Sequence, residues 1–305
     1  MTEWFDDVPI IGKLAPEKIA EVLRELGDFD AAASFDLAAE RPPTRPTTYG
    51  LRDLLKPPPW QHATHAFGYL GPRDQQGQPQ SIVHAGAIDP DRTLQGARVN
   101  VTLDHLGVFD YPGSGQHRVL FDFYAQHQAA ENTEHLHFNA TYRVRDREDV
   151  GLVGYPIFVG LRVGTEGLSF KCFTVNVKND DDEAFLGFME SDSFRSGLRL
   201  VETAQPAIGL LSTMAMGLTR SMAKRRRNVP VQDFFMGLDF SSRATGARLA
   251  TGSYVAVQIP PQLERVWRWD DWEYQPTRGL IVRRDDPDQT IPFNYVIIGV
   301  DRSVA

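Results

Sequence analysis

The chain has 305 residues, 42% hydrophobic and 24% charged, a composition ordinary for a globular protein of one large or two smaller domains. Its formal net charge of −8 argues against broad nucleic-acid binding, because a positive surface field supplies most of that affinity. Cys172 is the only cysteine, which excludes an intrachain disulfide and favours a reducing compartment. The acidic first residues lack the basic start and apolar core of a secretory signal. We therefore expect a soluble, cytoplasmic protein, and the excess of arginine over lysine is typical of a GC-rich prokaryotic genome.

The first 48 residues predict a helical arm followed by a linker. Pro16 suits the first position of a helix, and Gly27 suits its end. Between them, Ile19, Val22, Leu23 and Leu26 form one apolar face. Residues 28–48 are rich first in alanine and then in proline, which indicates a linker or an arm laid on another surface. We expect residues 1–48 to form this arm and residues 49–305 to form a separate β-rich domain.

The body of the chain alternates apolar and polar residues with a period of two, as half-buried strands do. The stretches 118–128 and 134–144 predict a hairpin. Other strands are expected at 99–103, 152–163, 167–178, 231–241, 247–259, 265–274, 279–284 and 292–300. Many short strands with few helical crossovers predict a mainly β fold, an antiparallel β-sandwich or jelly-roll-like body.

The hairpin carries a candidate metal site. If residue 128 pairs with residue 134, His127 lies opposite His135, and His137 follows on the same face. Three imidazoles on one face could bind zinc, or iron with an added carboxylate. The alternative is a polar outer face at the end of a hairpin. We expect no cofactor, with Zn or Fe at these histidines as the less favoured hypothesis.

Two helices are expected to interrupt the strands. The first lies near 181–190, because Asp180 and Glu183 have the spacing of a capping box. That assignment explains the acidic run 180–183 better than a calcium loop does.

The second inserted helix lies near 205–227. Its apolar face carries Ile208, Leu211, Ala215, Leu218 and Met222, and a second row of small residues carries Gly209, Thr213, Gly217 and Ser221. A basic cluster follows, consisting of Lys224, Arg225, Arg226 and Arg227. The favoured interpretation is a helix packed on the protein's own sheet. The alternatives are a helix that docks on a partner or second subunit, and one that inserts into a membrane.

Trp267, Trp269 and Trp272 form an aromatic segment with Arg265 nearby. Trp267 and Trp269 are expected to share one strand face. The rings could cover the open end of the sandwich core, or they could form a carbohydrate or peptide platform or a subunit contact.

No nucleophile elbow, phosphate loop or dinucleotide fingerprint is present in the sequence. Cys172 lies in a strand pattern and is expected to be a small buried hydrophobic residue. The leading hypothesis is a non-enzymatic binding or assembly module, which contacts a protein partner or a second copy of itself through the N-terminal arm, the tryptophans or the basic helix. The alternatives are a metal-dependent enzyme that uses the three histidines, and a membrane-acting effector that uses the helix at 206–227.

Overall fold

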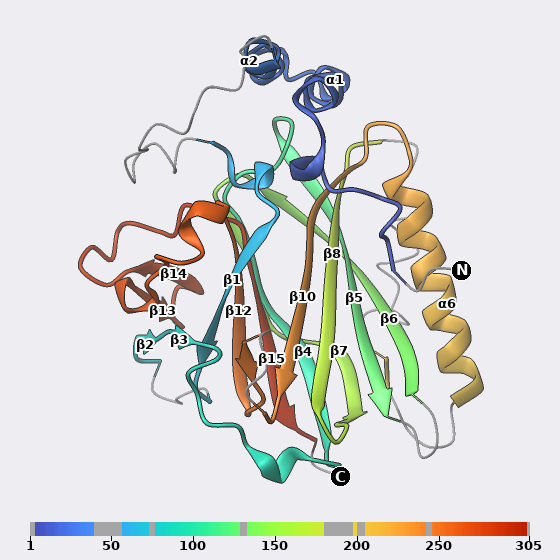
Figure 1. Cartoon of the computed structure of the whole chain (residues 1–305), viewed down its shortest axis with the longest axis vertical. Coiled ribbons are helices and arrows are strands. Elements are labelled where there is room, and N and C mark those ends of the chain that lie inside the picture. Colours follow the sequence, from blue (N-terminus) through green and yellow to red (C-terminus); the bar gives the residue numbers. More distant parts are fainter. Residues whose placement is uncertain are drawn as a thin grey trace.

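The computed structural model describes residues 4–39, 57–72, 77–128, 133–179, 198–199, 205–241 and 246–303. In these residues the fold is mainly β and sandwich-like, as the sequence pattern predicted (Figure 1). The expected helix near 181–190 lies outside the described residues. No helix in the described ranges is long and apolar enough to cross a membrane.

Two large sheets face each other, and a small third sheet packs outside them. The seven-stranded sheet has the order β3 (Val83–His84), β1 (Thr64–Leu70), β12 (Gly252–Ile259), β15 (Tyr295–Arg302), β4 (Arg98–Val108), β7 (Glu148–Arg162) and β9 (Leu198–Arg199). The five-stranded sheet has the order β11 (Ala247–Arg248), β10 (Val229–Asp239), β8 (Gly167–Val177), β5 (Gln116–Gln128) and β6 (Thr133–Arg145). The three-stranded sheet has the order β14 (Leu280–Arg283), β13 (Trp272–Gln275) and β2 (Gln80–Ser81).

The described strands pair antiparallel except for two short parallel pairs, β7 with β9 and β10 with β11. The hairpin of β5 and β6 forms where the sequence predicted it, but the expected register is wrong. Gln128 pairs with Thr133 instead of Glu134, so the connection is one residue shorter than assumed. Gln126 therefore lies opposite His135, and His127 lies opposite Glu134.

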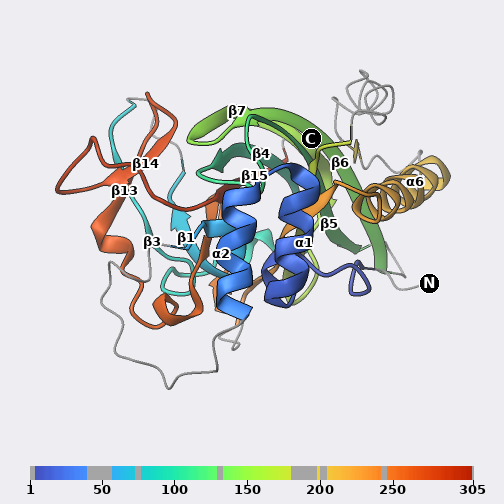
Figure 2. The ribbon, with the colours of Figure 1, turned by 90° about the horizontal axis from the view of Figure 1, so that it is seen from above.

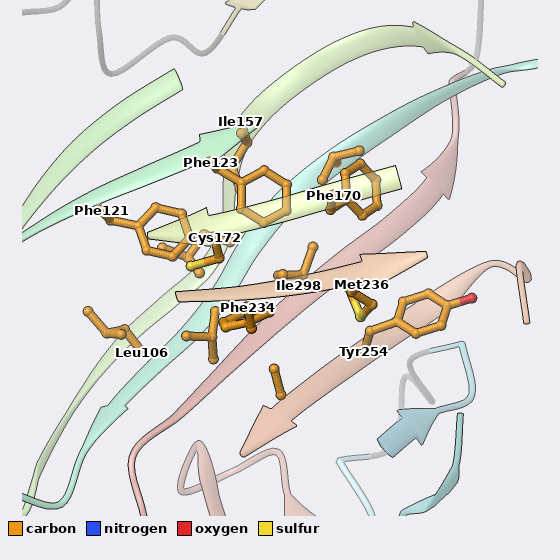
Figure 3. Close-up of a cluster of buried hydrophobic side chains, with 14 of the residues drawn as sticks. Leu106, Phe121, Phe123, Ile157, Phe170, Cys172, Phe234, Met236, Tyr254 and Ile298 are labelled. Carbon is orange, nitrogen blue, oxygen red and sulfur yellow. The ribbon is translucent and has the colours of Figure 1, made fainter. Parts of the chain in front are cut away.

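The main core lies between the two large sheets, as the alternation of their strands requires (Figure 3). Phe121 and Phe123 of β5 point inward and pack against Phe170 and Cys172 of β8. Cys172 is fully buried, as predicted, and burial raises the pKa of its thiol well above the ordinary value. It therefore serves as a core residue.

The outer face of each large sheet is also covered. The three-stranded sheet packs on the seven-stranded sheet through a second core that includes Trp269 and Trp272. The outer face of the five-stranded sheet is covered by the N-terminal segment, with Trp4, Phe5 and Ile10 buried, and by helix α6 (Gln205–Ala223). This second helix was expected, and its position on the chain's own sheet agrees with the favoured interpretation.

Helices α1 (Pro16–Leu26) and α2 (Phe29–Ala39) lie side by side across one end of the sandwich (Figure 2). Helix α1 begins at Pro16 and ends before Gly27 (φ +83°), as predicted. The alanine-rich start of residues 28–48, which was expected to be a linker or an arm laid on another surface, forms α2. Ala20, Leu23 and Ala32 join the main core. The described residues also include five short 3-10 helices: η1 (Ile11–Lys13), η2 (Pro59–Gln61), η3 (Arg92–Leu94), η5 (Pro261–Leu263) and η6 (Trp269–Asp271).

Candidate functional site

An acidic pocket of about 510 Å³ lies beside the α1–α2 connection. Four aspartates line it: Asp28, Asp30, Asp110 and Asp146. Trp60 of η2 forms part of the wall, and no lysine, arginine or histidine of the described residues is among the lining side chains. We call this site the acidic pocket.

Two of the aspartates follow from helix geometry. Gly27 adopts a left-handed conformation and ends α1, so the chain reverses at once into α2. The Asp28 carboxylate accepts the backbone N–H of Ala31 at 3.1 Å and caps α2, and Asp30 lies in the first turn. The turn between the helices therefore delivers two carboxylates to the pocket for reasons of local stability.

Asp146 is held in place by two donors. Its Oδ1 atom accepts the backbone N–H of Tyr111 at 3.0 Å and the Nε2–H of buried His117 at 2.9 Å. Asn176 donates from Nδ2 to His117 Nδ1 at 3.1 Å and also to Pro112 O, which assigns the ring proton of His117 to Nε2. This chain of hydrogen bonds connects the pocket to the polar part of the core.

Asp110 is the carboxyl group of the pocket whose ionised form is disfavoured by its surroundings. Its backbone is clamped by Asn294, which accepts the Asp110 N–H at 3.1 Å and donates to its carbonyl at 2.9 Å. Burial, followed by the charges of Asp146 and Asp28, raises the pKa of Asp110 to about 7. The Arg147 charge opposes this rise only in part. Such a perturbed group in a hollow is typical of a functional site.

Sequence reasoning missed the acidic pocket. Asp28 and Asp30 fell in a stretch interpreted as a linker or a surface arm, and Asp110 and Asp146 belong to separate loops of the β body. The only local signal was the Gly27-Asp28 pair, which could have been recognised as the end of one helix and the cap of the next. The convergence of these residues is a property of the tertiary fold.

His135 and His137 lie on the outer face of the five-stranded sheet, beneath α6. The Nδ1 atom of His137 lies 2.9 Å from Oδ1 of buried Asp122, and Nδ1 of His135 bonds the hydroxyl of Tyr124. Thr219 of α6 donates to the other Asp122 oxygen at 2.9 Å. In the ranges that the structure describes, no group of three or more His, Cys, Asp or Glu residues is arranged to hold a metal ion. The register that would place His127 with His135 and His137 on one face is wrong, because Gln126 lies opposite His135. Metal binding by His127, His135 and His137 stays a prediction.

The basic cluster lies just beyond α6, and two of its members bind the N-terminal arm. Lys224 pairs with Asp7 at 2.7 Å, and Arg226 pairs with Glu25 of α1 at 2.9 Å. Arg225 and Arg227 are exposed beside them. These pairs provide a structural role for part of the cluster, while its role in binding a partner stays a prediction.

The aromatic segment divides into two parts. Trp269 and Trp272 are buried in the second core, whereas Trp267 is half-buried and stacks on Trp272 with ring centroids 5.9 Å apart. The expected strand at 265–274 is wrong over its first half, because β13 begins only at Trp272 after η6. Trp267 and Trp269 consequently do not share a strand face, and their rings meet at 77°.

Comparison with models of protein families, with curated proteins and with solved structures gave no match for this chain.

Proposed function

We propose that this protein is a non-enzymatic binding module whose acidic pocket receives a cationic side chain, lysine or arginine, of a protein partner. The observation that carries the proposal is the Asp110 carboxyl group, with its pKa raised to about 7 by burial and by Asp146 and Asp28. An entering cation would stabilise the ionised form of this carboxyl and relieve the repulsion among the aspartates.

The surroundings of the pocket support a protein partner over a free amine. Phe29 lines the acidic pocket and is 68% exposed, and Leu37, also on α2, is 61% exposed. The exposed Phe29 beside the charged hollow suits the contact of a partner's apolar residue next to a central charged one. The methylene stem of a lysine or arginine would pack on Phe29 while its charged end reaches the carboxylates.

The test uses isothermal titration calorimetry with an acetylated tri-arginine amide and its neutral counterpart, tri-citrulline amide. We expect the tri-arginine peptide to bind and the tri-citrulline peptide not to bind. Asp110→Asn and Asp30→Asn should each weaken binding by about fivefold or more, since each removes one facing charge. Asp28→Asn removes a third charge while an asparagine can still cap α2.

Asp36→Asn is the control, because Asp36 is also on α2 but lies outside the acidic pocket, where its exposed ion pair with Arg24 contributes little to stability. Its affinity for the tri-arginine peptide should equal that of the wild type within twofold or so. If Asp36→Asn and Asp110→Asn weakened peptide binding equally, the peptide would be responding only to the net charge of −8, which would contradict the proposal. Equal binding of tri-citrulline would also contradict the proposal.

A pH series adds a second readout. A carboxyl with a pKa of about 7 becomes negatively charged as the pH rises through neutrality. Wild-type affinity for tri-arginine should therefore increase between about pH 6 and pH 8, and this increase should be absent from Asp110→Asn.

A further inference from the structure

A second pocket, unrelated to the acidic one, lies beside the tryptophans. It has a volume of about 120 Å³, and Val266, Trp267, Trp272 and Phe293 contribute its apolar walls. We call it the tryptophan pocket. Apolar walls with a few polar groups at the mouth are typical of sites for small ligands.

Packing in the second core explains only part of the aromatic surface of this pocket. Trp269 packs against β1 and Trp272 closes the second core, so both have a structural role. Val266, in contrast, is 61% exposed, and Trp267 is half-buried while it lines the hollow. The Trp267 ring is held rigidly by stacking at 7° on Trp272 and by an edge contact at 68° with Phe293. The fold thus maintains a preformed aromatic wall that faces an open space.

The polar part of the lining is predominantly positive. The lining contains two guanidinium groups, Arg268 and Arg283, and one carboxylate, Asp271, so it carries one net positive charge. Arg283 is already bonded through Nε to Asp285 at 2.6 Å. Arg268 is exposed and has no ion pair or hydrogen bond from its guanidinium to the described residues. The charge available to a ligand at the mouth is therefore that of Arg268.

We infer that the tryptophan pocket binds a single aromatic ring that carries a carboxylate. An apolar cavity of about 150 Å³ accepts a benzene ring, so a hollow of this order accommodates one ring but not a fused or multi-ring system. The ring packs against Trp267 and Val266, and its carboxylate lies at the mouth beside Arg268. A guanidinium matches a carboxylate with two parallel hydrogen bonds.

The probe is 4-fluorophenylacetate, observed by fluorine NMR on addition of the full-length protein. We expect its signal to broaden, and unlabelled phenylacetate to restore the sharp signal by competition. Phenethylamine has the same ring with a positive charge, and acetate has the charge without the ring. Each should need at least about tenfold more to compete, because each lacks one of the two recognised groups. Competition reports only on this pocket, so an amine that enters the acidic pocket leaves the signal unchanged.

The variants separate the charge from the ring. Arg268→Gln should weaken binding of 4-fluorophenylacetate by about tenfold, since a charge-assisted hydrogen bond is lost. Arg265→Gln, an exposed arginine outside the lining, should leave it unchanged. Trp267→Leu should abolish binding, and Val266→Ser, at an exposed position that folding tolerates, should weaken it severalfold. Absence of broadening at millimolar probe, equal competition by phenethylamine, or equal effects of Arg265→Gln and Arg268→Gln would each overturn the inference.

Discussion

The hydroxyl of Ser212 on α6 accepts the backbone N–H of His137 on β6 at 2.7 Å. The same hydroxyl donates to the carbonyl of His135 at 3.1 Å. In the described sheet β6 is an edge strand, bonded to β5 on one side only. Ser212 therefore satisfies edge groups that a neighbouring strand would otherwise bond, and α6 protects this part of the edge from pairing with another chain.

Replacing Ser212 by alanine should destabilise the protein by about 1–3 kcal/mol, because it leaves buried backbone groups without a partner. Chemical denaturation measures the change, and hydrogen exchange of the His137 amide should become faster. Ser221→Ala is the matched control, since Ser221 is exposed on the same helix. It should change stability by no more than about 0.5 kcal/mol. Equal stabilities of the two variants would contradict the proposed role of the hydroxyl.

Gly68 of β1 provides the space into which Trp269 packs. A Cβ atom at this position would lie 2.6 Å from Cγ2 of Ile82 and 3.0 Å from the ring of Trp269. We expect Gly68→Ala to cost about 1–3 kcal/mol through overpacking, and to change tryptophan fluorescence. Gly71→Ala, where nothing lies within 4 Å of the added atom, should be neutral or stabilising by up to about 1 kcal/mol. A neutral Gly68→Ala would show that the second core can shift to make room.

The pKa of Asp110 predicts a loss of stability with rising pH. Its value of about 7 in the folded protein exceeds the unfolded value of about 3.9, so the folded state binds this proton more tightly. The resulting stability is fully present below about pH 4 and is lost as the pH rises through 7. Asp110→Asn, which resembles the neutral acid, should be about 1–2 kcal/mol more stable than wild type near pH 8, a figure reduced for partial solvent exposure. Chemical denaturation across this pH range measures the stability of wild type, of Asp110→Asn and of the control Asp36→Asn. Parallel profiles of stability against pH for Asp110→Asn and wild type would contradict the prediction.

The buried His65 predicts a loss of stability as the pH falls. Burial, only partly offset by a hydrogen bond to Gln232, lowers the pKa of His65 to about 4, whereas the unfolded value is near 6.5. The unfolded chain therefore binds the proton first, and stability falls as the pH drops from about 6.5 to 4. His65→Gln should reduce this acid-induced loss by about 2–3 kcal/mol, measured by denaturation at several pH values. The exposed His84→Gln serves as the control and should leave the loss unchanged.

The alternation of apolar and polar side chains identified the strands well, because consecutive residues of a half-buried strand face the core and the solvent in turn. The predicted stretch 118–128 corresponds to β5 at Gln116–Gln128, and 167–178 corresponds to β8 at Gly167–Val177. The boundaries of α1 were equally local, since Pro16 and Gly27 act on their own backbone. The body was predicted as a mainly β sandwich on this basis.

The predictions from sequence were wrong where the local structure depends on a single residue of a turn or on a contact with a distant part of the chain. The register of β5 and β6 depends on the turn between them, and one residue fewer places Gln126 instead of His127 opposite His135. The stretch containing Trp267 and Trp269 alternates like a strand, but the second core draws Trp269 inward through a 3-10 turn. Helix α2 has a weakly amphipathic sequence and is stabilised by packing against α1.

The sequence by itself determined the mainly β character, the positions of most strands and the boundaries of α1, because these follow from propensities and periodicities of neighbouring residues. Only the tertiary structure decided which strand edge α6 covers, and that Asp28, Asp110 and Asp146 surround one pocket. Residues so far apart in the chain are brought together by long-range packing. The desolvation and mutual repulsion that raise the pKa of Asp110 do not exist until that packing is complete.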